Sequence, residues 1–181
     1  MNAKVKTTLK AWPLIAAATI GISMATTLVA EAFGMKLTVQ ASLGVIRRMA
    51  GLNWPFVKML LYVLVRAPVL EELVFRGLLW RLPAGVLGWI FGKARLPRAL
   101  AAGLSAVLAV VASILFSAAH YVNMPWPDNA FAALFFFGLA QCWLYRRVGK
   151  WHAIWCPVLN HFLFNLTNLV LLFTLPESWL Q

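Results

Sequence analysis

The chain has 181 residues, of which 62% are hydrophobic and 12% are charged, and its net charge is +11. About a quarter of the residues in soluble domains are charged, so this composition excludes an ordinary soluble protein and indicates an integral membrane protein. The Lys and Arg residues are spread over the flanks of apolar segments instead of forming one basic face, which argues against nucleic acid as a partner. We expect a single transmembrane domain over residues 1–181, an all-α polytopic bundle with five or six transmembrane helices of about 20 residues each.

Five long apolar segments predict the helices of this bundle. They cover residues 12–33, 54–82, 99–122, 130–145 and 153–175. The first follows Lys4, Lys6 and Lys10, a pattern that a signal peptide would also show. The segment is longer than the apolar part of a signal peptide and has no clear cleavage site, so we expect a retained helix.

Two further segments differ from the five helices. Residues 35–50 are too polar to span a bilayer, and their basic residues favour an amphipathic helix that lies in the membrane interface. Residues 83–92 are apolar, contain glycines and are too short to cross, which predicts a re-entrant or interfacial piece.

Basic residues indicate the orientation of the bundle. If the N-terminus lies inside, most Lys and Arg residues fall at inner helix ends, including Arg81 at the end of the second helix. Only Lys36, Arg47 and Arg48 fall at outer ends. Because Lys and Arg are enriched in inner loops, we expect the N-terminus inside and the C-terminus outside.

The second helix contains the run LEELVFRG, which places two glutamates and an arginine inside an apolar segment. Ionisable groups within a membrane helix are costly and by default mark a functional interior. Glu72 and Arg76 are four residues apart, in the order that favours an ion pair on one helix face. Glu71 points about 100° away from Glu72, so it can face the bundle interior as a candidate general base.

Two other polar pairs share the same four-residue step. Phe116 and His120 belong to FSAAH in the third helix, and His161 and Asn165 belong to HFLFN in the fifth. A four-residue step puts both members of a pair on one helix face. His161 and Asn165 can therefore offer two hydrogen-bond donors to one developing oxyanion, and His120 can orient a water against Glu71.

These motifs resemble EExxxR, FxxxH and HxxxN of the CAAX protease and bacteriocin-processing (CPBP) family, also called the Abi family. Each motif is unspecific alone, but three in this order on successive hydrophobic segments, with FRG after the glutamates, form a specific pattern. The resemblance covers about residues 67–171. It implies a protease core at about 54–175, a variable N-terminal helix at 12–33, and a glutamate-type intramembrane endopeptidase.

The resemblance also implies a role for each motif residue. Glu71 and His120 would activate the attacking water, and the fifth-helix pair would stabilise the oxyanion. Glu72 would be a supporting glutamate. The expected catalytic residues are Glu71, Glu72, His120, His161 and Asn165, with structural support from Arg76 and Phe116.

No cofactor is expected for this chemistry. Family members are described as glutamate peptidases, although a metal-dependent mechanism has been proposed for some, so zinc is the less favoured alternative. The sequence has no HExxH, and its His and Glu residues lie on three helices, a layout that can ligate zinc but does not indicate it. Cys142 and Cys156 lie in apolar segments, which predicts packing roles for both.

The implied substrates are membrane-anchored or lipidated proteins and peptides: prenylated CAAX tails, bacteriocin leaders, or C-terminal anchor helices removed during sorting. The small extramembrane mass resembles the bacterial members, so we expect the bacterial cytoplasmic membrane. Two alternatives stay open. Intramembrane Glu, His and Arg also form proton relays in ion-coupled transporters, although no internal repeat supports that class here. A non-catalytic immunity or scaffold protein would tolerate substitution of Glu71.

The expected helix ends place His120 and Glu71 at different depths. His120 lies about 32 Å along its helix from Ala99, whereas Glu71 lies about 15 Å from Arg81. If both ends sit at one membrane surface, the two side chains cannot meet. Their pairing then requires either a third helix that extends beyond the inner surface or a shift in register caused by the 84–92 piece.

Overall fold

The computed structural model describes residues 2–33, 55–93, 97–120, 130–149 and 151–174. Every regular element within these ranges is a helix, which confirms the all-α class. The interfacial helix expected at 35–50 lies outside the described residues.

The described residues form five helical rods, one for each predicted helix. Their elements are α1 (Ala3–Ala32), α3 (Phe56–Leu61), η1 (Tyr62–Arg66), α4 (Ala67–Glu71), η2 (Glu72–Arg81), α5 (Leu82–Lys93), α6 (Arg98–Ala119), α7 (Ala130–Val148), η3 (Trp151–Ile154) and α8 (Trp155–Thr174). Two of these, η1 and η2, are π-helical, and η3 is a short 3-10 helix before α8. The sequence pattern does not indicate these π-helical turns.

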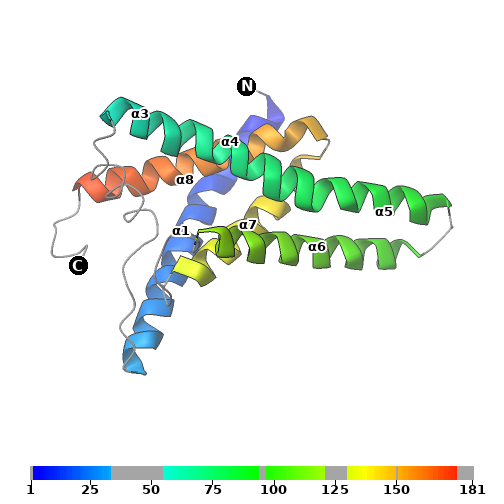
Figure 1. Cartoon of the computed structure of the whole chain (residues 1–181), viewed down its shortest axis with the longest axis horizontal. Helices are drawn as coiled ribbons and strands as arrows, with labels where there is room; N and C mark the ends of the chain where they lie inside the picture. The colour runs from blue at the N-terminus through cyan, green and yellow to red at the C-terminus, as the bar shows by residue number, and fades with distance from the viewer. Residues whose placement is uncertain (1, 34–54, 94–96, 121–129, 150, 175–181) are drawn as a thin grey trace.

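The second rod is longer than predicted, because α3, η1, α4, η2 and α5 follow one another without a break (Figure 1). The separate re-entrant or interfacial piece expected at 83–92 is therefore wrong. A helix satisfies its backbone polar groups internally, which favours its continuation through an apolar stretch even where that stretch contains glycine. A Cβ atom added at Gly85 or Gly88 would meet nothing within 4 Å, so neither glycine marks a close contact or a turn.

This continuation removes the mismatch in depth between Glu71 and His120. The second rod ends at Lys93, and α6 starts at Arg98 and runs back beside α5 and η2 as the other arm of a hairpin (Figure 1). The same number of residues separates Glu71 from Lys93 and His120 from Arg98, and Nε2 of His120 lies 3.9 Å from Oε2 of Glu71. The two side chains therefore reach the same level, and Arg81 lies within a helix instead of at its end.

The remaining rods complete the bundle around α7. This helix packs against α6, α1 and α8, while α8 also lies along the η1 and α4 part of the second rod (Figure 1). Buried aromatic side chains from three rods form the core where these helices meet, including Trp80, Phe116, Phe137 and Tyr145. Glu71 thus lies where the far end of α6 and the first half of α8 approach the same side of the second rod.

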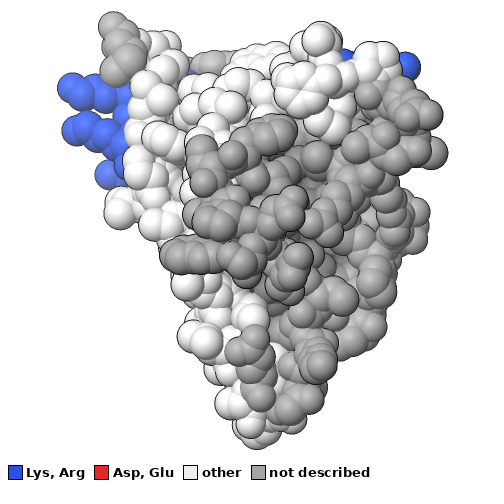
Figure 2. All heavy atoms as spheres, turned by 90° about the vertical axis from the view of Figure 1, so that its left-hand side faces the viewer, with Lys and Arg blue, Asp and Glu red and all other residues white. Residues whose placement is uncertain are grey.

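Two of the described helices are long and apolar enough to cross a membrane by length and composition, Ala3–Ala30 and Ala99–Ala119. On the face seen in Figure 2, the described Lys and Arg atoms lie toward the upper edge above an uncharged described surface. Basic residues gathered toward one end of an uncharged surface agree with the pattern that a bilayer favours. These features agree with an integral membrane protein, and the number of five or six spans stays a prediction.

Candidate active site

The glutamate pair lies at the junction of α4 and η2. Glu72 is fully buried, and its Oε2 lies 3.3 Å from Nε of Arg76, which confirms the predicted ion pair. The Arg76 guanidinium also lies over the ring of Phe116, 4.2 Å from the ring centroid. A buried guanidinium of this kind is stabilised both by the carboxylate and by the negative face of the ring.

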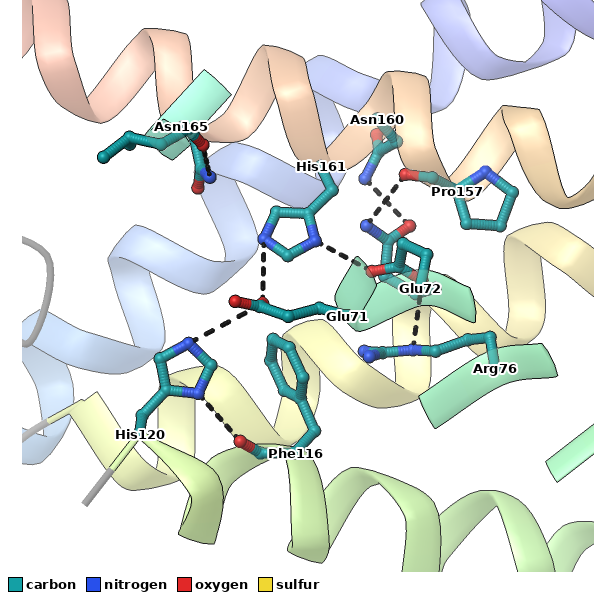
Figure 3. A network of polar contacts seen from close by, with 11 residues as sticks. Glu71, Glu72, Arg76, Phe116, His120, Pro157, Asn160, His161 and Asn165 are labelled. Atoms are coloured by element: carbon teal, nitrogen blue, oxygen red, sulfur yellow. Dashed lines mark hydrogen bonds and ion pairs between the residues drawn. The ribbon is translucent and has the colours of Figure 1, made fainter. Parts of the chain in front are cut away.

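His161 contacts both glutamates from α8 (Figure 3). Its Nδ1 lies 2.8 Å from Oε1 of Glu72, a hydrogen bond between two buried side chains. Its Nε2 lies 3.7 Å from Oε2 of Glu71. Because an ionised carboxylate only accepts hydrogen bonds, Nδ1 of His161 carries the proton in this arrangement and Nε2 faces Glu71.

His120 faces Glu71 from the opposite side, at the end of α6 (Figure 3). Its Nδ1 lies 2.8 Å from the backbone oxygen of Phe116, and its Nε2 lies 3.9 Å from Oε2 of Glu71. A carbonyl oxygen can only accept, so Nδ1 donates and Nε2 of the neutral ring is an acceptor. Both histidines are thus fixed through Nδ1 and turn Nε2 toward the same carboxylate oxygen.

The ring of Phe116 contacts both histidines of this cluster. It packs edge-on against His120, with ring centroids 4.7 Å apart, and against His161, with ring centroids 5.9 Å apart. Phe137 contacts His161 from α7, with a centroid distance of 5.1 Å. The aromatic side chains therefore fix the ring planes of both histidines and line the polar groups with apolar surface.

The carboxylate oxygen between the histidines has an unsatisfied hydrogen-bonding capacity. Oε2 of Glu71 is buried and has no hydrogen-bond partner among the described residues, although the side chain as a whole is 27% exposed. The two Nε2 atoms are too distant to bond to it directly. Oε2 of Glu72 and the Arg76 nitrogens likewise make no hydrogen bond within the described part of the chain, so what distinguishes Glu71 is the position of its Oε2 between the Nε2 atoms of two histidines.

Asn165 departs from the expected arrangement. Its Nδ2 donates to the backbone oxygen of Val63 in η1, with a distance of 2.8 Å, while the amide itself lies one helical turn beyond His161 (Figure 3). The amide nitrogen carries two hydrogens, and this bond uses one of them. The fifth-helix pair thus shares a helix face, as the spacing predicted, but one donor of Asn165 serves the backbone.

A buried amide pair joins α7 and α8 beside the site. Asn160 donates from Nδ2 to Oε1 of Gln141 at 3.2 Å. Gln141 was not singled out, although it is fully buried on α7 and its Nε2 donates to the backbone oxygen of Pro157 at 3.3 Å. A glutamine in an apolar helix is itself a signal for an interhelical hydrogen bond.

Gly138 is the second feature that sequence reasoning missed. A Cβ atom added there would lie 2.9 Å from Cβ of Ser113 and 3.2 Å from Nη2 of Arg76. The glycine therefore allows α7 to approach α6 closely and leaves room for the guanidinium that pairs with Glu72. Its role depends on contacts between helices distant in sequence, which no local pattern indicates.

No group of three or more His, Cys, Asp or Glu side chains in the described part of the chain is arranged to hold a metal ion. Cys142 and Cys156 are free and buried, as expected for packing residues. The titratable groups that gather around Glu71 thus offer acid–base and hydrogen-bonding chemistry at one buried oxygen.

A model of the Rce1-like family, described as type II CAAX prenyl endopeptidase Rce1-like, matches residues 53–167. This range contains all three motifs and well over half of the chain, and the match confirms the resemblance that the motifs indicated. No curated protein and no solved structure matches the chain.

Proposed function

The chain belongs to the Rce1-like family of type II CAAX prenyl endopeptidases, which are glutamate-type intramembrane proteases, and we propose that Glu71 activates the attacking water. The observation that carries this assignment is the position of Oε2 of Glu71, which Nε2 of His120 faces at 3.9 Å and Nε2 of His161 faces at 3.7 Å. Membership of an endopeptidase family favours the protease over the transporter and scaffold alternatives.

The water binds at Oε2 of Glu71 and is oriented by His120. Neutral His120 accepts one hydrogen of the water at Nε2, because its Nδ1–H is bound to the Phe116 carbonyl. Glu71 accepts the other hydrogen, so a lone pair of the water is directed away from both groups. Attack on the scissile carbonyl carbon then transfers one proton from the water to Glu71.

The same proton can complete the reaction. The attack forms a C–O bond and leaves negative charge on the former carbonyl oxygen. When the C–N bond breaks, protonated Glu71 delivers its proton to the leaving nitrogen, and the carboxylate is regenerated without a covalent acyl-enzyme. The reaction consumes one water and one peptide bond and gives one carboxyl group and one amine, with the proton returned from Glu71.

His161 and Asn165 act on the oxyanion. With hydrogens on both ring nitrogens, His161 can donate from Nε2 to the oxyanion while its Nδ1–H stays bonded to Glu72. Asn165 donates through the N–H that is not bonded to Val63. In this assignment Glu72 orients His161, and Arg76 balances the charge of Glu72 in the buried interior.

We place the reaction in or next to the bacterial cytoplasmic membrane, with the N-terminus inside and the C-terminus outside. The whole chain is taken as one domain, with a protease core at about 54–175. The proposed substrates are membrane-anchored or lipidated proteins, cut during maturation or C-terminal sorting. The proposed chemistry uses no metal ion.

Cleavage of a defined reporter in cells tests this function. A prenylated CAAX peptide fusion and a fusion ending in a C-terminal anchor helix are each co-expressed with the wild type, Glu71→Gln or Asn168→Ala at matched protein levels. Asn168 lies on α8 outside the proposed machinery and serves as the control. We expect the wild type and the control to cleave at least one reporter and Glu71→Gln to cleave none. Equal cleavage by all three would overturn the proposal.

A further inference from the structure

Pro68 lies inside the second rod, three residues before Glu71, and is fully buried. The preceding turn is π-helical: the backbone N–H of Ala67 donates to the oxygen of Tyr62, five residues earlier. Continuing this pattern, the N–H of residue 68 would donate to the oxygen of Val63. Proline has no N–H, so this bond cannot form.

The Val63 carbonyl that Pro68 leaves without a helical donor is the one that Asn165 binds. The distance from Nδ2 of Asn165 to this oxygen is 2.8 Å. In an apolar environment a backbone carbonyl without a donor is costly, and prolines within membrane helices are tolerated where a neighbouring helix supplies one. Pro68 thus leaves the Val63 oxygen free and Asn165, far away in sequence, binds it, which forms one contact between η1 and α8.

We infer that Pro68 is a positioning residue for Asn165. It exposes the Val63 oxygen, this oxygen binds one N–H of the Asn165 amide, and the planar amide then presents its second N–H in a fixed direction. The same bond ties α8 to the second rod two turns before Glu71. The inference rests on the proposed role of Asn165 at the oxyanion, but the bond itself can be tested without any catalytic assay.

The first test measures thermal unfolding of the full chain in detergent for the wild type, Pro68→Ala, Asn165→Ala and the double variant. Asn165→Ala removes the donor from a buried carbonyl, and we expect the unfolding temperature to fall by about 2–4 °C. In Pro68→Ala the alanine N–H can donate to the Val63 oxygen. Adding Asn165→Ala to this variant should therefore lower the unfolding temperature by less than half as much as it does in the wild type. Equal decreases in both backgrounds would overturn the inference, whether or not the protein is a protease.

The second test measures kcat and KM of the same four proteins on a cleaved reporter. Asn165→Ala should lower kcat about 100-fold with little change in KM, as expected for one oxyanion donor. Pro68→Ala alone should lower kcat. Adding Asn165→Ala to this variant should lower kcat further by clearly less than 100-fold. The two substitutions could have non-additive effects on the unfolding temperature but independent effects on kcat, so that the two losses of kcat multiply. The bond would then only hold the helices together, and the positioning role would be overturned.

A further comparison keeps the inference testable if Pro68→Ala does not fold. Asn165→Asp places an acceptor against the Val63 oxygen, whereas Asn168→Asp adds the same charge on the same helix without this contact. We expect the unfolding temperature to fall further in Asn165→Asp. Equal decreases would overturn the inference. As a proline control, Pro83→Ala combined with Asn165→Ala should give additive effects on stability.

Discussion

Nδ1 of His161 lies 2.8 Å from Oε1 of Glu72, so the second glutamate orients this histidine while the first faces its other nitrogen. The two adjacent carboxylates therefore have different surroundings. Glu72 contacts His161 and Arg76, and Glu71 lies between the Nε2 atoms of two histidines. Glu72 therefore orients His161, and Glu71 is available for the chemistry.

Glu72→Leu is expected to destabilise the protein strongly. The change leaves the buried Arg76 guanidinium without its carboxylate, and breaking a buried ion pair costs about 3–5 kcal/mol. Unfolding by denaturant in mixed micelles measures the effect. The double variant Glu72→Leu with Arg76→Met should recover much of the loss, since it removes both charges. A Glu72→Leu variant as stable as the wild type would contradict the assigned ion pair.

Gly138→Ala tests the close approach of α6 and α7. The added methyl group would lie 2.9 Å from Cβ of Ser113 and 3.2 Å from Nη2 of Arg76, so the helices must separate or the guanidinium must move. We expect a loss of about 1–3 kcal/mol in the free energy of unfolding. Gly85→Ala is the matched control, because a Cβ there meets nothing within 4 Å. If both variants unfold alike, the proposed packing is wrong.

Gln141→Ala tests the amide pair that holds the start of α8. It removes the donor to the Pro157 oxygen and the acceptor of Asn160, two buried groups. Leaving the Asn160 amide without this acceptor should lower the free energy of unfolding by about 1–3 kcal/mol. In an α-helix the N–H of residue 161 donates to the oxygen of residue 157, so kcat should fall as well. Unchanged stability and kcat would exclude a supporting role.

Metal independence is expected from the proposed chemistry. Dialysis of the purified protein against a strong chelator should leave kcat unchanged, and added zinc should not raise it above the untreated value. The unfolding temperature, measured in the same samples, would show whether the chelator affects the fold. A loss of activity that zinc restores would contradict the proposal and favour the zinc alternative.

The sequence predicted the elements of this fold better than their connection. The five helices and the pairing of Glu72 with Arg76 follow from apolar length and four-residue spacing, both local properties. The continuation of the second helix through 83–92 was not predicted, because its glycines suggested a break. Helical hydrogen bonding in an apolar stretch outweighed that signal, and the pairing of His120 with Glu71 depends on it.

The tertiary contacts of the site were less accessible to sequence reasoning. The motif spacing placed His161 and Asn165 on one face, but it did not show that Asn165 also binds the backbone of Val63. Pro68 was a local signal for that contact, because a proline inside a helix always leaves a carbonyl without its donor. The packing of α8 on η1 decides which side chain supplies the donor, and these two elements are far apart in sequence.

The role of Glu71 as the base is tested by kcat of purified Glu71→Gln in lipid nanodiscs, with the unfolding temperature measured on the same sample. The substitution keeps the size of the side chain but removes its capacity to accept a proton from water. If Glu71 is the base, kcat falls by about 10²–10⁴ while the unfolding temperature stays at or above that of the wild type. A Glu71→Gln protein that cleaves at the wild-type rate would show that the carboxylate is not the base.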